Sequence, residues 1–140
     1  MKIAIGCDHA GFCLKSEILQ AFPELDWQDF GAFNAASMDY PDTGRPAAQA
    51  VANGSCEKGI LICGSGIGMS IVANKVKGIR AALCWTPEIA QLSRMHNNSN
   101  ILVLAGRFTT TPIALEIIRV WLNTSFEGGR HQARIDKIEV

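Results

Sequence analysis

The sequence predicts an α/β fold with a parallel sheet that helices cover on both faces. Short apolar segments alternate with segments of helical spacing along the whole chain. The apolar segments, such as Gly59-Ile60-Leu61-Ile62-Cys63, lack the polar alternation of a half-exposed strand, which is typical of strands buried on both faces. We expect one domain over residues 1–140, in which a parallel sheet of five strands is followed by a C-terminal helix.

The apolar and helical patterns divide the chain into individual strands and helices. The expected strands are residues 2–7, 27–30, 58–63, 79–84 and 101–105. The expected helices are residues 12–22, 45–53, 69–74, 86–95, 111–122 and 130–140. Residues 34–44 are expected to form a loop.

Local signals set the ends of these elements, taken in order along the chain. Pro23 ends the first helix, and Gly54 ends the alanine-rich helix that begins near Arg45. Thr86-Pro87-Glu88 supplies an N-cap, a proline in the first turn and an acidic residue, which together begin a helix. Thr111-Pro112 begins another helix in the same way.

Composition excludes several classes of protein. Acids and bases number 13 each, so no bulk charge favours nucleic acid or an anionic membrane. No apolar run approaches the roughly 20 residues of a membrane span, and the N-terminus enters a strand pattern without the features of a signal peptide. Five cysteines without paired spacing fit reduced thiols in the cytoplasm better than disulfides. No CxxC or histidine-rich cluster indicates a metal.

Reactive side chains follow the ends of three predicted strands. Asp8 and His9 follow the first strand, Cys63 and Ser65 stand at the end of the third, and Arg107 follows the fifth. Ligands of open parallel sheets bind beyond the carboxyl ends of the strands. We therefore expect these residues to meet at one edge of the sheet.

A glycine-rich turn, Gly64-Ser65-Gly66-Ile67-Gly68, joins the third strand to the next helix. The glycines do not match the GxGxxG fingerprint because residue 69 is methionine, and the Gly-Lys-Ser/Thr of a P-loop is absent. NAD and ATP are therefore poorly supported. Free backbone N–H groups of the turn can hold an oxyanion. The alternative is a tight turn without a ligand, but three glycines in five residues exceed what such a turn needs.

Cys63 differs from the other cysteines because it precedes a helix N-terminus, which favours the thiolate. A thiolate there is either a nucleophile, which normally needs a histidine relay, or a base, which needs only an acidic C–H and an oxyanion hole. The remaining cysteines are expected to be inert core residues. They are Cys7, Cys13, Cys56 and Cys84.

Two further groups of residues lie outside this edge. His96 and Asn97 are expected on the loop before the fifth strand, at the opposite end of the sheet from Cys63. They are either surface residues or part of a neighbouring subunit's site. Arg130 and Arg134 share one face of the last helix and could clamp a phosphate. A solvated basic face, to which His131 and Lys137 add positive charge, is the alternative.

Several motifs occur in a recognisable order along nearly the whole chain. They are Gly6-Cys7-Asp8-His9-Ala10-Gly11, Asp39-Tyr40-Pro41, the turn Cys63-Gly64-Ser65-Gly66-Ile67-Gly68 with Ala73-Asn74-Lys75, Gly78-Ile79-Arg80-Ala81, His96-Asn97, and Glu127-Gly128-Gly129-Arg130-His131 with Arg134. This set resembles the ribose-5-phosphate isomerase type B family, which includes galactose-6-phosphate and allose-6-phosphate isomerases. The resemblance implies a Rossmann-like three-layer α/β/α fold, a homodimer or dimer of dimers, and no metal or cofactor.

The resemblance also implies a reaction. Members of the family interconvert an aldose phosphate and a ketose phosphate through an enediolate, here ribose 5-phosphate and ribulose 5-phosphate of the pentose phosphate pathway. By position, Cys63 would move the proton between C1 and C2, while the backbone of residues 64–68 would hold the enediolate oxygens. Some relatives use a glutamate as the base where this chain has Ile67, which favours Cys63.

The remaining roles follow from the same resemblance. His96 would protonate the ring oxygen and open the furanose, and Ser65 would assist near the sugar oxygens. Asp8 and Tyr40 would orient hydroxyl groups or His96, and Asn97 would contact the sugar. The substrate would also be bound, mainly at its phosphate, by His9, Arg107, Arg130 and Arg134.

Three other readings stay open at this point. One is a hexose 6-phosphate isomerase acting on allose or galactose 6-phosphate, because pocket depth cannot be read from the sequence. Another is a non-catalytic subunit that binds phosphosugars, against which the presence of Cys63, Ser65, His96 and Asn97 argues. The third is a thiol-dependent hydrolase, which would need a histidine placed to serve Cys63 within its own chain.

Overall fold

The computed structural model describes residues 1–139 and confirms the predicted α/β fold. Its strands are β1 (Lys2–Cys7), β2 (Asp26–Asp29), β3 (Lys58–Cys63), β4 (Ala81–Leu83) and β5 (Ile101–Ala105). Its helices are α1 (Phe12–Ala21), α2 (Pro41–Ala52), α3 (Ile67–Asn74), α4 (Pro87–Asn97), α5 (Thr111–Asn123) and α6 (Arg130–Ile135), with a short 3-10 helix η1 (His9–Gly11). The strands pair in parallel in the order β2-β1-β3-β5-β4. No helix within residues 1–139 is long and apolar enough to cross a membrane.

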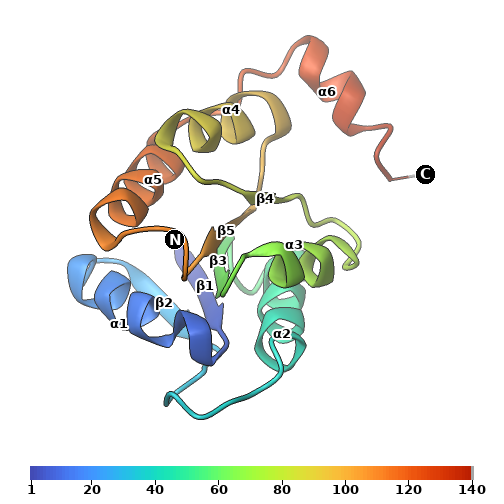
Figure 1. The fold of residues 1–140 in the computed structure, drawn as a ribbon. Helices are drawn as coiled ribbons and strands as arrows, with labels where there is room; N and C mark the ends of the chain where they lie inside the picture. The colour runs from blue at the N-terminus through green and yellow to red at the C-terminus, as the bar shows by residue number, and fades with distance from the viewer. Residues whose placement is uncertain (140) are drawn as a thin grey trace.

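Helices cover both faces of the sheet, with α1, α4 and α5 on one side and α2 and α3 on the other (Figure 1). Alternate residues of β3 therefore enter different layers of the core. Ile62 belongs to the buried cluster that contains Trp121 of α5. Cys63 belongs to the cluster that contains Met69 of α3. The thiol thus lies in the α2/α3 layer, on the side where the glycine-rich turn leads into α3.

The predicted strand over residues 79–84 is shortened to Ala81–Leu83 in the structure. β4 is an edge strand that pairs only with β5 among the described residues. The backbone N–H just before β4 is bound by a side chain instead of a neighbouring strand, because the Arg80 N–H donates to the side chain of Asn100 at 2.8 Å. The predicted strand is therefore present, but residues 79 and 80 belong to the loop that leads into it and not to the strand.

The loop predicted for residues 34–44 is wrong at its C-terminal end, because α2 begins at Pro41 rather than near residue 45. Proline suits a first helical turn, where its missing N–H costs nothing. The added turn packs closely on α3, since a Cβ atom at Gly44 would lie 2.5 Å from the Met69 sulfur. A glycine at this position thus allows the two helices that flank the Cys63 layer to approach.

A buried ion pair that the sequence analysis did not identify holds the segment after β2. The Lys15 ammonium is 2% exposed and donates to both Asp29 carboxylate oxygens, at 2.7 and 2.8 Å. It also donates to the Ala32 carbonyl. A buried charge needs such partners, because an unpaired ammonium would lose its hydration without compensation.

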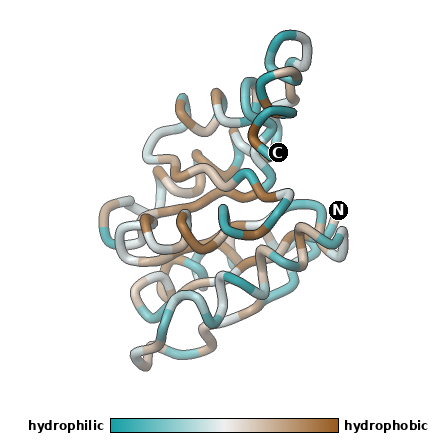
Figure 2. The backbone as a smooth tube through the Cα atoms, turned by 90° about the vertical axis from the view of Figure 1, so that its right-hand side faces the viewer, coloured by the Kyte–Doolittle hydropathy of each residue, from teal (hydrophilic) through white to brown (hydrophobic). Residues whose placement is uncertain are grey.

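The C-terminal helix is shorter than predicted. α6 covers Arg130–Ile135, whereas a helix over residues 130–140 was expected, and Val140 lies outside the described residues. α6 projects from the rest of the chain beside α4 in Figure 1, and Figure 2 shows the same projection from the side. The Glu127 N–H donates to the Met95 carbonyl at 3.1 Å, which ties the segment before α6 to the end of α4.

Candidate active site

Backbone hydrogen bonds tie three strand ends together at the carboxyl edge of the sheet. The Asp8 N–H donates to the Ile62 carbonyl at 3.2 Å, and the Arg107 N–H donates to the Gly64 carbonyl at 3.0 Å. The residues that follow β1, β3 and β5 are thus neighbours, as parallel pairing requires. The edge brings together part of the predicted site: Asp8, His9, Tyr40, Cys63, Gly64, Ser65, Gly66, Ile67, Gly68 and Arg107.

Cys63 is a free thiol at the last position of β3. It is only 4% exposed, so little of the residue is in contact with solvent. Partial exclusion of water at that point strengthens the electrostatic effect of nearby dipoles. The position is compatible with a base that acts on a substrate lying over the turn.

The other cysteines divide into buried and exposed. Cys7, Cys56 and Cys84 are buried as expected, and burial raises the pKa of Cys7 and of Cys84 to about 11. These thiols are therefore protonated and unreactive at neutral pH. The expectation of a core position is wrong for Cys13, which is exposed because it lies on the outer side of α1.

The glycine-rich turn offers several free donors. Gly66 has φ of 77°, a backbone conformation that favours glycine, and caps the start of α3. The Ile67 N–H is already used, since it donates to the Ser65 hydroxyl oxygen at 3.2 Å. Within residues 1–139 the N–H groups of Ser65, Gly66 and Gly68 have no acceptor. Of the backbone donors predicted for an oxyanion hole, the Ile67 N–H is therefore occupied, while those of Ser65, Gly66 and Gly68 are available.

Tyr40 and Arg107 form the walls of this turn. A Cβ atom at Gly68 would lie 2.6 Å from Cζ of Tyr40, and one at Gly64 would lie 3.3 Å from Nη1 of Arg107. Both side chains therefore lie directly against the backbone of the turn. A phenol and a guanidinium here can donate to oxygen atoms of a ligand that rests on the same backbone.

Asp8 and His9 are held by local hydrogen bonds. Asp8 Oδ1 accepts from the N–H groups of Ala10 and Gly11, at 3.0 and 3.2 Å, and so caps η1. His9 Nδ1 accepts from the Met38 N–H at 3.2 Å. That bond selects the tautomer with its proton on Nε2, which leaves an N–H donor available to an anionic ligand.

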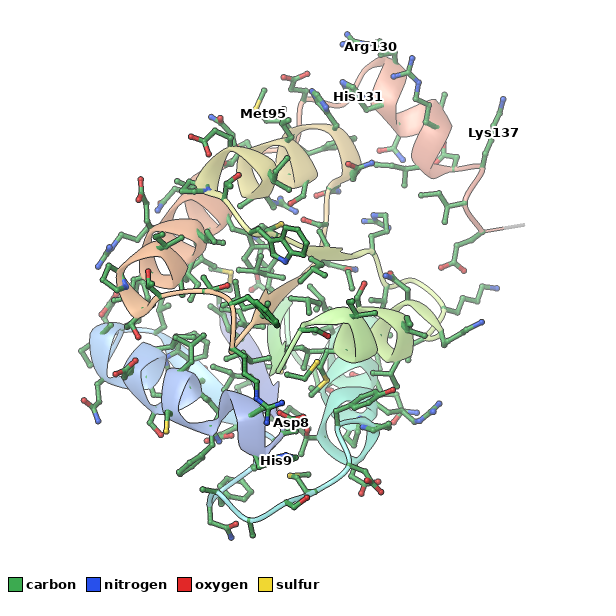
Figure 3. The ribbon with its side chains drawn as sticks, in the orientation of Figure 1. Asp8, His9, Met95, Arg130, His131 and Lys137 are labelled. Atoms are coloured by element: carbon green, nitrogen blue, oxygen red, sulfur yellow. The ribbon has the colours of Figure 1, made fainter. Side chains whose placement is uncertain are left out.

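The remaining predicted site residues lie at the far end of the molecule. His96 and Asn97 occupy the last turn of α4 rather than the expected loop. They line a cavity of about 410 Å³ together with His131, Arg134, Ile135 and Ile138. Figure 3 shows Arg130 and His131 at the opposite end of the molecule from Asp8 and His9. One chain thus carries two separate clusters of candidate residues.

The imidazole rings of His96 and His131 are stacked, with centroids 4.4 Å apart and planes inclined by 15°. His131 is 5% exposed, and its Nε2 lies 3.4 Å from a Glu127 carboxylate oxygen. Burial and the adjacent His96 and Arg130 hold the pKa of His131 below its ordinary value. The expectation that His131 adds positive charge is therefore wrong at neutral pH.

His96, Glu127 and His131 also present potential metal-ligating atoms within 4.8 Å of one another. A histidine-bound metal lies in the plane of the imidazole ring, along the nitrogen lone pair. Two nearly parallel stacked rings cannot both direct such lone pairs at one ion. The guanidinium groups of Arg130 and Arg134 also oppose a cation here. We therefore assign no metal to this cluster.

Comparison with known proteins places this arrangement in a family. A family model described as Ribose/Galactose Isomerase matches residues 3–138. The chain belongs to the ribose/galactose isomerase family. Its sequence is 47% identical over 139 residues to ribose-5-phosphate isomerase B of Escherichia coli (strain K12), which covers 98% of this chain and 93% of that protein.

Solved structures of the ribose/galactose isomerase family share the fold closely. Ribose-5-phosphate isomerase B of Clostridium thermocellum superposes with a TM-score of 0.97 at 48% identity, covering 99% of this chain and 95% of that one. The enzyme from Mycoplasma genitalium, solved with bound ribulose-5-phosphate, has a TM-score of 0.93 at 42% identity, covering 98% and 93%. The family resemblance identified from the motifs is confirmed.

Sequence reasoning missed two features of the second cluster. It treated His131 as a surface charge, and it gave Glu127 no role beyond its place in a motif. These residues are four apart, but Glu127 lies before α6, and Gly128 and Gly129, both with positive φ, separate it from His131, so no helical pattern joins them. Their proximity to His96 depends on the tertiary contact between α4 and α6.

Proposed function

We propose that this protein is an aldose–ketose isomerase that interconverts ribose 5-phosphate and ribulose 5-phosphate without a metal or organic cofactor. The observation that carries the proposal is the free, nearly enclosed thiol of Cys63 at a strand end, followed directly by backbone donors that have no acceptor within residues 1–139. The relatives named ribose-5-phosphate isomerase B support this substrate, as does the Mycoplasma genitalium structure with bound ribulose-5-phosphate.

In the proposed chemical step Cys63 acts as the base. The thiolate removes the proton from C2 of the open-chain aldose, and the C–H electrons form the C1–C2 double bond while the carbonyl oxygen takes up negative charge. Donors at Ser65, Gly66 and Gly68 stabilise this charge, and each donor of this kind is worth about 100-fold or more in rate. A proton then passes from O2 to O1 of the enediolate. Cys63 returns the abstracted proton to C1, which leaves a hydroxyl group on C1 and the ketone at C2.

Ring opening and phosphate binding belong to the second cluster in this proposal. Ribose 5-phosphate is mainly a furanose, so a group must protonate the ring oxygen before C2 is acidic. His96 supplies that proton, and Asn97 beside it contacts the sugar. Arg130 and Arg134 hold the phosphate by charge-assisted hydrogen bonds, with His9 and Arg107 approaching from the other cluster.

The two clusters lie at opposite ends of one chain, so a complete site requires a second copy (Figure 3). We propose a homodimer, or a dimer of dimers, in which α4 and α6 of one protomer complete the Cys63 site of its partner. Large apolar side chains on α3, on α4 and just before α4 are exposed in the single chain, which supports an interface there. They are Ile67, Ile71, Trp85, Ile89 and Leu92.

The proposed enzyme acts in the cytoplasm as a single sugar-phosphate isomerase domain. All five cysteines are free thiols, including the buried Cys7 and Cys84, which fits a reducing compartment. A metabolic isomerase of phosphorylated sugars works where its substrates are made and retained.

The function is tested by direct turnover. The purified protein is incubated with ribose 5-phosphate or with allose 6-phosphate in the presence of EDTA, and the ketose formed is measured. We expect rapid conversion of the pentose phosphate and slower conversion of the hexose phosphate. Faster conversion of allose 6-phosphate would reassign the substrate, and no conversion of either would reject the isomerase.

A further inference from the structure

The His96 ring is stacked against a neighbouring imidazole. Within residues 1–139 no hydrogen bond involves either of its ring nitrogens. Its contact is the parallel face of His131, with ring centroids 4.4 Å apart. An acid–base histidine normally needs a partner that fixes its orientation, and here the neighbouring ring is placed to do so.

His131 itself is firmly seated. It is 5% exposed, and its backbone N–H donates to the Gly128 carbonyl at 3.2 Å. Glu127 flanks it, and the Glu127 N–H donates to the carbonyl of Met95, the residue before His96. The short segment from Glu127 to His131 therefore holds the His131 ring against the His96 ring. Within residues 1–139 the buried His131 Nε2 has no hydrogen-bond partner, and the nearest carboxylate oxygen, of Glu127, lies 3.4 Å away.

We propose that His131 is a positioning residue, whose buried ring fixes the plane of the His96 imidazole for opening of the sugar ring. The inference rests on the proposed function of His96. It adds a residue that touches no reacting atom but sets the angle at which His96 approaches the ring oxygen. Misplacement of a proton donor by about 1 Å is enough to cost on the order of 100-fold in rate.

The charges around the pair favour this division of roles. The charged and titratable groups that surround His131 come from three segments. They are His96 of α4, Glu127 of the segment before α6, and Arg130 and Arg134 of α6 itself. Burial, His96 and the arginines disfavour a proton on His131, while Glu127 alone opposes them. Two adjacent imidazoles also avoid carrying two positive charges. His131 is therefore the neutral ring of the pair, as suits a residue that orients its neighbour rather than donating a proton.

Two substitutions at residue 131 separate positioning from other roles. His131→Ala removes the stacked ring, and we expect kcat for ribose 5-phosphate to fall at least about tenfold with KM within about twofold. His131→Phe keeps a flat neutral ring, and kcat should return to within about threefold of the unmodified protein. Gln132→Ala, on the exposed side of the same helix, is the matched control and should change neither constant.

Each alternative role gives a different result. If the alanine variant instead raises KM with kcat unchanged, His131 merely docks the helix that carries Arg130 and Arg134, and the proposal is overturned. If the phenylalanine variant is as slow as the alanine variant, His131 transfers protons rather than positioning His96, which also overturns it.

A second readout isolates the ring-opening step. Ribulose 5-phosphate cannot form a five-membered ring, because its O5 carries the phosphate, so exchange of its C1 proton with solvent deuterium bypasses ring opening. His131→Ala should leave this exchange within about twofold of the unmodified protein while forward turnover falls. An equal loss of both would contradict a role in ring opening.

The stack is also measured without turnover. The Hε1 resonance of His96 should show a ring-current shift that disappears in His131→Ala and persists in His131→Phe. An unchanged resonance in both variants would overturn the inference even if the isomerase is active. If the unmodified protein converts neither sugar phosphate, the proposed function fails while this resonance still decides whether His131 orients His96.

Discussion

The Tyr40 ring lies directly against Gly68, where a Cβ atom would be only 2.6 Å from Cζ of the phenol. Real side chains do not approach so closely, so Gly68→Ala must displace either the ring or the first turn of α3. Because the Gly68 N–H is one of the proposed oxyanion donors, we expect kcat/KM to fall about 100-fold with the fold retained. Steady-state kinetics measures the change in kcat/KM, and circular dichroism checks that the fold is retained.

Ser70→Ala, two residues further along α3, is the matched control and should leave kcat/KM nearly unchanged. Combining Gly68→Ala with Tyr40→Ala removes the clash between the new methyl group and the ring. The double variant should nevertheless regain only part of the lost activity, because the phenol is also removed. Full activity in Gly68→Ala would show that the start of α3 does not bind the reacting end.

Shared sites predict complementation between two inactive variants. Cys63→Ala and His96→Ala are each expected to be inactive with ribose 5-phosphate. In a mixed dimer, one of the two sites takes its thiol and its imidazole from unmodified residues. Co-expressed chains that pair at random should therefore recover about one quarter of the normal activity.

The measurement compares co-expressed variants with each variant alone at equal protein concentration. If Cys63 and His96 of the same chain formed each site, every site in the mixture would carry one substitution. Activity would then stay at the level of the single variants, and the proposed arrangement of the dimer would be wrong.

The phosphate clamp predicts a selective effect on binding. Arg134 lines the same cavity as His96, so Arg134→Ala should raise KM for ribose 5-phosphate about tenfold or more, with a smaller change in kcat. Lys137→Ala removes a positive charge just beyond α6 and serves as the control. Equal effects of the two substitutions would point to a general electrostatic attraction instead of a clamp.

The depressed pKa of His131 predicts that α6 is less firmly held in acid. Burial, followed by the charges of His96 and Arg130, makes the folded chain bind fewer protons at this residue than the unfolded chain. The packing of α6 should therefore be at full strength above the ordinary histidine pKa, and should weaken as pH falls below about 6.5. Glu127 opposes this trend, and Arg134 adds to it.

Amide exchange of residues 130–135 measures this effect at about pH 8 and about pH 5.5, on either side of the ordinary histidine value. Protection should decrease at the lower pH in the unmodified protein, and the difference should be much smaller in His131→Phe. Equal protection at both pH values in the unmodified protein would mean that His131 takes up a proton without disturbing the segment.

The sequence was sufficient for the sheet and for the carboxyl-edge cluster because both depend on local patterns. Continuous apolar runs mark β1, β3 and β5, and parallel pairing then brings the residues that follow them together. Boundaries failed where tertiary contacts outweighed local signals. The alanine-rich run suggested a helix start near residue 45, but α2 begins at Pro41, and its added turn packs on α3 at Gly44.

The second cluster was predicted only in part. Arg130 and Arg134 were found from their helical spacing, which survives in a short helix. The buried ring of His131 was not, because the packing of α6 on α4 determines its exposure. Lys15 was missed for the same reason, since its partner Asp29 comes from a different element.

Turnover by Cys63→Ala tests the central claim most directly. The variant removes the proposed base but leaves the backbone donors and the phosphate-binding arginines in place. We expect kcat for ribose 5-phosphate to fall by about 1,000-fold or more, while substrate still binds with nearly normal affinity in a calorimetric titration. A Cys63→Ala protein that isomerises ribose 5-phosphate at the normal rate would contradict the account.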